Sequence, residues 1–127
     1  MVVLDTSVII DNLRKPVHES VLVKLFEKHP KEIFAVSVVS IQELYEGKST
    51  KDETRENHLL STLGSLTVLG YTTDVAKLAG KIARDLRTPI EFADVAIAAT
   101  TIANGGELVT LNEKHFKGIA NLDLLKY

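Results

Sequence analysis

VVLDTSVII, residues 2–10, is the stretch that decides the fold. Its first part, Val2-Val3-Leu4, is a short apolar run of the kind that forms a buried strand. Asp5 ends the run, and Thr6 and Ser7 then supply side chains that favour the start of a helix. The stretch therefore predicts a strand that passes directly into a helix.

The rest of the chain continues this alternation of strands and helices. Further strands are predicted at 33–36, 66–69, 107–110 and 122–125. Helices are predicted at 8–13, 17–28, 40–46, 52–63, 89–103 and from Thr73 or Asp74 to 86. Short apolar strands that alternate with helices predict one α/β domain, residues 1–127, with a mainly parallel central sheet flanked by helices.

The composition limits the classes of function. Of the 127 residues, 45% are hydrophobic and 25% are charged, and the net charge is −2, which is typical of a globular domain. The absence of cysteine excludes disulfides, thiolate metal sites and Cys nucleophiles, and it fits a cytoplasmic location. Neither a membrane span nor a signal peptide is expected. Nucleic-acid binders typically carry a basic excess, so nucleic-acid contact here requires a local basic patch or metal ions.

Three acidic residues border or interrupt apolar segments. Asp5 ends the first strand, Glu43 lies within the segment 38–45, and Asp94 lies within the segment 92–99. An unpaired carboxylate near a core costs on the order of several kcal/mol, and none of these segments contains Lys or Arg. A bound cation is the compensating charge that this pattern favours.

Asp5 and Glu43 each have an alternative structural role. Asp is a favoured residue at a helix N-cap, and Asp5 immediately precedes a predicted helix. Ser40-Ile41-Gln42-Glu43 matches a capping box, in which the glutamate side chain binds the backbone amide of the first residue. The capping role and the metal-binding role remain open for both acids at this point.

Asp94 has a weaker structural alternative. Thr88-Pro89-Ile90-Glu91 also matches a capping box, and a helix that starts there places Asp94 in its second turn. Asp94 then shares a face with Glu91 and Arg87, and like charges one turn apart are unfavourable without a partner. Arg87 is the alternative to a metal ion as that partner.

The three acids together indicate a metal site. Carboxylates from a strand end and two helix starts can converge outside the carboxyl edge of a parallel sheet. An oxygen-only ligand set without Cys or a suitably spaced His pair favours Mg²⁺ or Mn²⁺ over Zn²⁺. Such ions hydrolyse phosphodiesters by activating water and stabilising the leaving oxygen.

Other polar residues carry weaker signals. The four histidines, His18, His29, His58 and His115, show no metal-ligand spacing and are predicted at the surface. Lys77, Lys81 and Arg84 form a basic stripe on a predicted helix, which is either a solvated face or a ridge that contacts phosphates. Neither a nucleophile elbow nor a phosphate-binding glycine loop is present in the sequence.

Four segments, in order, carry a family resemblance. They are Leu4-Asp5-Thr6-Ser7; Ser40-Ile41-Gln42-Glu43-Leu44 with Gly47; Ala93-Asp94-Val95-Ala96-Ile97-Ala98-Ala99; and Leu108-Val109-Thr110-Leu111-Asn112 with His115-Phe116. The chain resembles PIN-domain ribonucleases, and in particular VapC-type toxins of prokaryotic toxin–antitoxin pairs. The resemblance covers nearly the whole chain, and the first and third segments are its more specific parts.

The resemblance implies a PIN-like three-layer sandwich and a Mg²⁺- or Mn²⁺-dependent endoribonuclease. It implies that Asp5, Glu43 and Asp94 are the catalytic residues and hold the metal, and that Thr6 or Thr110 orients a ligand or a water molecule.

The fourth acidic position of the family differs here. Many members carry an acid where this chain has Asn112, whose carbonyl can still coordinate but adds no charge. Glu91, one turn from Asp94 on the predicted helix, is a candidate to compensate. One metal ion or two remains open on this pattern.

The resemblance also implies an RNA substrate, a homodimer and a cognate antitoxin protein whose tail enters the acidic groove. Two alternative functions fit the same family resemblance. One is a stand-alone PIN nuclease in RNA processing, and the other is a catalytically inactive PIN-like scaffold. A receiver domain or a phosphatase of the D-x-D type is disfavoured, because a single Asp5 follows the first strand and residue 7 is Ser.

Overall fold

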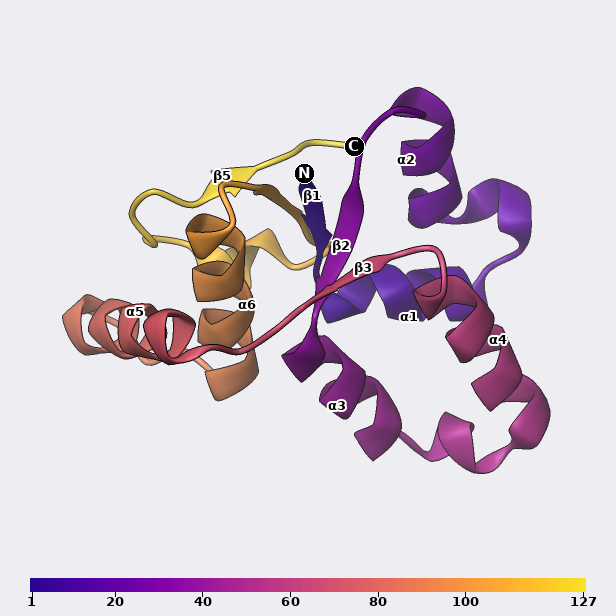
Figure 1. The fold of residues 1–127 in the computed structure, drawn as a ribbon, viewed down its shortest axis with the longest axis horizontal. Helices are drawn as coiled ribbons and strands as arrows, with labels where there is room; N and C mark the ends of the chain where they lie inside the picture. The colour runs from indigo at the N-terminus through magenta and orange to yellow at the C-terminus, as the bar shows by residue number, and fades with distance from the viewer.

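The computed structural model describes residues 1–127, and a five-stranded sheet forms its centre (Figure 1). The strands are β1 (Val2–Leu4), β2 (Phe34–Ser37), β3 (Thr67–Leu69), β4 (Glu107–Val109) and β5 (Asp123–Leu124). They lie in the order β3-β2-β1-β4-β5, and each neighbouring pair is parallel. Because β1 is the central strand, the residue that follows it, Asp5, lies at the middle of the carboxyl edge.

Helices cover both faces of the sheet (Figure 1). The α-helices are α1 (Thr6–Arg14), α2 (Val21–Lys28), α3 (Val38–Glu46), α4 (Glu53–Leu63), α5 (Thr73–Asp85) and α6 (Phe92–Ala103), and the 3₁₀ turns are η1 (Val17–Glu19), η2 (Lys48–Lys51) and η3 (Glu113–Phe116). Helices α1 and α2 pack together on one side, and α5 packs against α6 on the other. Helix α3 contacts both α1 and α6, and therefore closes the carboxyl edge.

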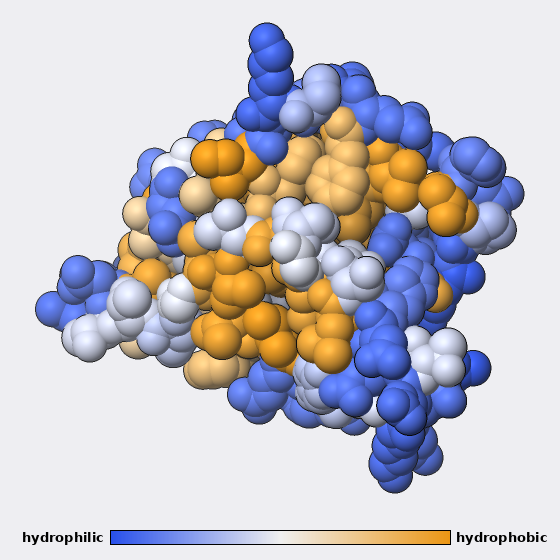
Figure 2. Space-filling view, turned by 45° about the vertical axis from the view of Figure 1, so that its right-hand side comes forward, coloured by the Kyte–Doolittle hydropathy of each residue, from blue (hydrophilic) through white to orange (hydrophobic).

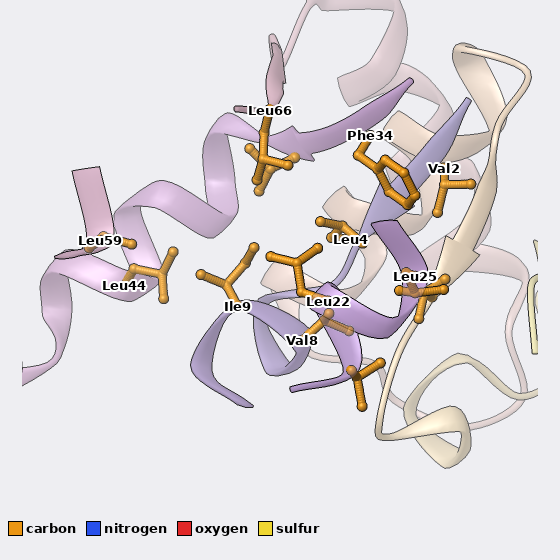
Figure 3. Packing of buried hydrophobic residues seen from close by; sticks show 13 residues of the cluster. Val2, Leu4, Val8, Ile9, Leu22, Leu25, Phe34, Leu44, Leu59 and Leu66 are labelled. Carbon is orange, nitrogen blue, oxygen red and sulfur yellow. The ribbon is translucent and has the colours of Figure 1, made fainter. Parts of the chain in front are cut away.

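The side chains of β1 alternate between two apolar clusters. Val2 and Leu4 join the larger cluster, which α1, α2 and α4 complete, and Figure 3 shows its side chains turned toward one another. Val3 points to the opposite face, into a cluster with Ile97 of α6 and Leu108 of β4. Burial on both faces is what a central parallel strand requires. The prediction of an α/β fold with a parallel sheet between helical layers is confirmed.

Four predicted helix starts differ from the structure by two residues or more. Helix α1 begins at Thr6 instead of residue 8. The predicted helix 17–28 is interrupted at Ser20, which ends η1 and whose side chain caps α2. Helix α3 begins at Val38 instead of residue 40, because Ser37 at the end of β2 accepts a hydrogen bond from the Val39 amide. Helix α6 begins at Phe92 instead of residue 89, with Glu91 in an extended conformation before it. None of the helices combines the length and the apolar character needed to cross a bilayer.

Candidate active site

A crevice of about 540 Å³ opens at the carboxyl edge of the sheet, where α1, α3 and α6 meet. The three acids predicted from the sequence, Asp5, Glu43 and Asp94, all line it, together with Asn112. Glu46 and Glu91 add two further carboxylates, and neither Lys nor Arg lines the crevice. The structure therefore places the three predicted acids around one crevice, and neither Lys nor Arg neutralises their charge there.

Asp5 is held by hydroxyl groups. Its side chain is 4% exposed, and its Oδ2 accepts hydrogen bonds from Ser7 Oγ at 2.8 Å and from Thr110 Oγ1 at 2.7 Å. Although Asp5 occupies the N-cap position of α1, its side chain makes no capping hydrogen bond. The two donors fix the carboxylate and leave Oδ1 without a hydrogen bond. The structure therefore does not support the capping alternative for Asp5.

The two hydroxyl groups that donate to Asp5 also accept hydrogen bonds from backbone amides of the segment that follows β4. Ser7 Oγ accepts a hydrogen bond from the Leu111 amide at 3.1 Å, and Thr110 Oγ1 accepts one from the Asn112 amide at 3.0 Å. Thr110 is 3% exposed. The start of α1 is thus locked to the residues that follow β4. Sequence reasoning considered Ser7 only as a helix cap, although it lies two residues after Asp5.

Glu43 is held from α1. Thr6 Oγ1 donates a hydrogen bond to Glu43 Oε1 at 2.6 Å and lies 2.9 Å from Ser40 Oγ. The predicted capping box from Ser40 to Glu43 is wrong, since both residues lie inside α3 and Ser40 is fully buried. A hydroxyl 37 positions away in sequence orients the carboxylate instead.

Asp94 lies in the first turn of α6, one turn earlier than predicted. Its carboxyl is 17% exposed, and Oδ2 lies 3.4 Å from His115 Nδ1. Burial raises the pKa of Asp94; His115 opposes this shift, and the charges of Asp5, Glu43 and Glu91 add to it. The net pKa therefore lies above the ordinary value, chiefly because burial disfavours the charged carboxylate and secondarily because like charges lie near it.

The alternative partner weighed for Asp94, Arg87, is not found beside it, and the neighbour that the structure shows was not predicted. Arg87 forms no ion pair with Asp94, because residue 87 lies in the loop before α6 and not on the helix. His115, in η3, takes that place. No local pattern in the sequence marks His115, because it reaches the crevice only through the pairing of β4 with β1.

The donor chemistry of the crevice fits a hard divalent cation. Carboxylate oxygens and one amide carbonyl are the ligand types that Mg²⁺ and Mn²⁺ prefer, and neither Lys nor Arg lines the crevice. No three acidic or histidine groups are already gathered at metal-binding distances from one point. The acids thus line one crevice but do not form a preassembled three-ligand metal site.

Comparison with models of known protein families gives one match that covers nearly the whole chain. The family model described as "PIN domain" matches residues 2–122. The chain belongs to the PIN-domain family. The match spans β1 to the residue before β5, so it includes every residue of the crevice and confirms the resemblance seen in the sequence.

Relatives of this PIN domain include named toxin–antitoxin proteins. It is 29% identical over 119 residues to Ribonuclease VapC19 of Mycobacterium tuberculosis, with 91% of this chain and 92% of the relative covered. It matches a chain of VapBC2 from Rickettsia felis, solved with a promoter DNA fragment, at a TM-score of 0.89 and 28% identity over 100% and 99% of the two chains. It matches a chain of DNA-bound VapBC from Salmonella typhimurium at a TM-score of 0.85 and 27% identity over 98% and 96%.

Proposed function

We propose that this PIN domain is a Mg²⁺- or Mn²⁺-dependent endoribonuclease and the toxin of a toxin–antitoxin pair. The observation that carries the proposal is the convergence of Asp5, Glu43 and Asp94 on one crevice that lacks Lys and Arg. The similarity to Ribonuclease VapC19 over most of both chains supports RNA as the substrate.

In this proposal, Asp5, Glu43 and Asp94 hold the metal ion, and Asn112 offers a neutral carbonyl beside them. A divalent ion bound there supplies a water of lowered pKa and offsets the charge of the phosphate. Ser7 and Thr110 fix the carboxylate of Asp5, and Thr6 fixes that of Glu43. Hydrogen bonds of this kind orient metal ligands and raise affinity for the ion.

Each remaining residue then has a limited role. His115 lies close enough to Asp94 to exchange a proton with it or to contact a phosphate at the mouth of the crevice. Glu91 lines the crevice but is exposed at the cap of α6, so its contribution is to the local negative charge. The crevice residues thus provide one set of fixed acids for one ion, with Asn112 as the place where a second ion would be less firmly held.

Protein partners form the second part of the proposal: an antitoxin and a second copy of the chain. The structural relatives with TM-scores of 0.89 and 0.85 are chains of VapBC complexes. Apolar side chains gather on one face of the molecule, with residues of intermediate hydropathy between them and hydrophilic residues around them (Figure 2). Exposed apolar areas of this kind are typical of protein–protein contact sites.

We propose that the chain acts as one domain, in the cytoplasm.

RNA cleavage by the purified chain tests the enzyme proposal. With Mg²⁺ or Mn²⁺ present, we expect the native chain to cleave single-stranded RNA and Asp94→Asn to lose activity about 100-fold or more. The matched control is Asp74→Asn, which changes an acid that also lies in the first turn of a helix, α5, outside the crevice. Equal cleavage by the native chain and Asp94→Asn would refute the assignment of the site.

A further inference from the structure

A second groove, of about 960 Å³, continues from the acidic crevice between the loop 86–91 and η3. The groove and the crevice share four lining residues: Glu91, Phe92, Asp94 and His115. A ligand that enters the crevice can therefore extend along the groove without leaving the protein surface.

The charged residues of the groove differ between its two parts. The acids Glu91 and Asp94 also line the crevice, whereas the part that the crevice does not share, the basic end, carries Arg87, Lys114 and Lys117. All three of these cations are exposed, and none takes part in an ion pair.

One acid, Asp85, also lines the basic end of the groove, but it is already engaged. Arg84 donates to both of its carboxylate oxygens, at 2.8 and 3.0 Å. The basic end of the groove therefore presents net positive charge to a ligand, which suits a chain of phosphates.

Phe92 stands where the crevice and the groove join. Its side chain is 65% exposed, and its one aromatic neighbour, Tyr71, lies at a centroid distance of 5.9 Å and an interplanar angle of 57°. Packing within the protein therefore does not account for a phenylalanine at this position. An exposed aromatic ring beside a basic groove is the arrangement on which unpaired bases stack in single-stranded nucleic-acid binding.

We infer that this groove binds the RNA strand next to the scissile phosphate, with one base stacked on Phe92 and the following phosphates on Arg87, Lys114 and Lys117. The inference rests on the proposed nuclease function and specifies where its substrate lies. The groove replaces the basic stripe on α5 as the expected phosphate contact, because Lys77, Lys81 and Arg84 line neither the crevice nor the groove.

The first test measures stacking on Phe92. Binding of a fluorescein-labelled 12-nucleotide single-stranded RNA is measured with Mg²⁺ in an Asp94→Asn background, where cleavage is expected to be lost. We expect Phe92→Ala to weaken binding about 5- to 150-fold, Phe92→Leu to weaken it similarly, and Phe92→Tyr to retain it. Val17→Ala, at an equally exposed apolar residue (65%) outside both pockets, is the control and should bind normally. Native affinity in Phe92→Ala or Phe92→Leu would overturn stacking.

A second measurement does not depend on how Phe92→Ala folds. The chain has no tryptophan, so Phe92→Trp introduces a single tryptophan at the proposed contact, whose fluorescence can be excited selectively. Addition of the unlabelled 12-nucleotide RNA should quench this fluorescence, and should leave that of Val17→Trp unchanged. Absence of quenching at position 92 at RNA concentrations that saturate binding would overturn the inference.

The third test separates the groove from the overall charge of the protein. Lys114→Gln/Lys117→Gln and Lys77→Gln/Lys81→Gln each remove two positive charges, and neither pair disturbs the bond between Arg84 and Asp85. The groove pair should reduce the slope of log Kd against log salt by about 1.4, at about 0.7 per phosphate contact of a single strand. The stripe pair should leave the slope unchanged. Equal effects of both pairs would overturn the assignment of phosphates to the groove.

Failure of this inference and failure of the proposed function give different results. If the native chain cleaves RNA with Mg²⁺ or Mn²⁺ while the Phe92 and lysine variants bind normally, the groove assignment is wrong and the nuclease stands. If those variants lose binding but the native chain never cleaves, the groove stands and the nuclease proposal is wrong.

Discussion

Thr110→Val is the substitution that examines how the protein holds its central carboxylate. Valine has nearly the same shape as threonine, so the change removes one hydroxyl from a position that is 3% exposed and leaves the packing volume in place. Two hydrogen bonds are lost: the one that Thr110 donates to Asp5 at 2.7 Å, and the one it accepts from the Asn112 amide at 3.0 Å.

The magnitude follows from the groups left behind. A hydrogen bond to a charged group contributes about 1.5–3 kcal/mol, and a neutral one about 1 kcal/mol. Asp5 keeps its bond from Ser7, and Asn112 is exposed, so water can reach its vicinity. We therefore expect Thr110→Val to lower the free energy of unfolding by about 2 kcal/mol. A less firmly oriented Asp5 should also lower Mn²⁺ affinity and RNA cleavage by about 10- to 100-fold.

The assay compares two buried threonines. Urea unfolding gives stability, calorimetric titration with Mn²⁺ gives affinity, and cleavage of a labelled RNA gives activity. The control is Thr101→Val, which removes a hydroxyl that donates to the Ile97 carbonyl of the same helix at 2.8 Å, away from the crevice. Thr101→Val should cost about 1 kcal/mol or less and leave Mn²⁺ affinity and activity unchanged. The reasoning is refuted if Thr110→Val keeps native affinity and activity.

Two further predictions concern stability. Burial raises the pKa of Asp11, but hydrogen bonds from Lys15 and the Val21 amide and the charges of Lys15 and Lys24 outweigh it, and the net pKa lies below 3.8. Because its folded pKa is depressed, charged Asp11 stabilises the fold above pH 3.8, and this contribution is lost as pH falls through the folded pKa. Unfolding free energy should thus fall more steeply below pH 3.8 for the native chain than for Asp11→Asn; parallel curves would contradict this. Leu22→Ala, at a core residue 1% exposed, should cost about 2–5 kcal/mol in urea unfolding, against about 0.5 kcal/mol or less for Leu60→Ala, which is 49% exposed; equal losses would contradict the described packing.

The central strand and its helix were predictable because their signals are local. Val2-Val3-Leu4 is buried on both faces and Asp5 follows directly, so the apolar run alone indicates the strand and its end. Parallel pairing then brings the acids after different strands to one edge. The convergence of Asp5, Glu43 and Asp94 was predictable for this reason.

The contacts that orient those acids were not predictable from local patterns. Ser40 to Glu43 has the spacing of a capping box, yet Ser37 is the residue that caps α3. The spacing is necessary for a capping box but does not choose between two serines three positions apart. Which serine caps α3 depends on where β2 ends, and the end of β2 depends on its pairing with β1.

The long-range contacts of the site were not predictable for the same physical reason, although the family resemblance named Thr6 and Thr110 as orienting residues. Thr6 reaches Glu43 across 37 residues, and Thr110 reaches Asp5 across 105. His115 approaches Asp94 only after β4 has paired with β1 and η3 has folded behind it. The sequence pattern predicts Phe92 as part of an apolar helix. In the structure it is exposed at the crevice because it lies in the first turn of α6.

Anomalous diffraction from a crystal soaked with Mn²⁺ tests the central claim most directly. The account predicts an anomalous peak in the crevice, within coordination distance of carboxylate oxygens of Asp5 and Asp94, and its loss in a crystal of Asp94→Asn. The same map counts the ions and shows whether a second one lies beside Asn112. A soaked crystal with no peak in the crevice, or with its peak unchanged in Asp94→Asn, would contradict the account.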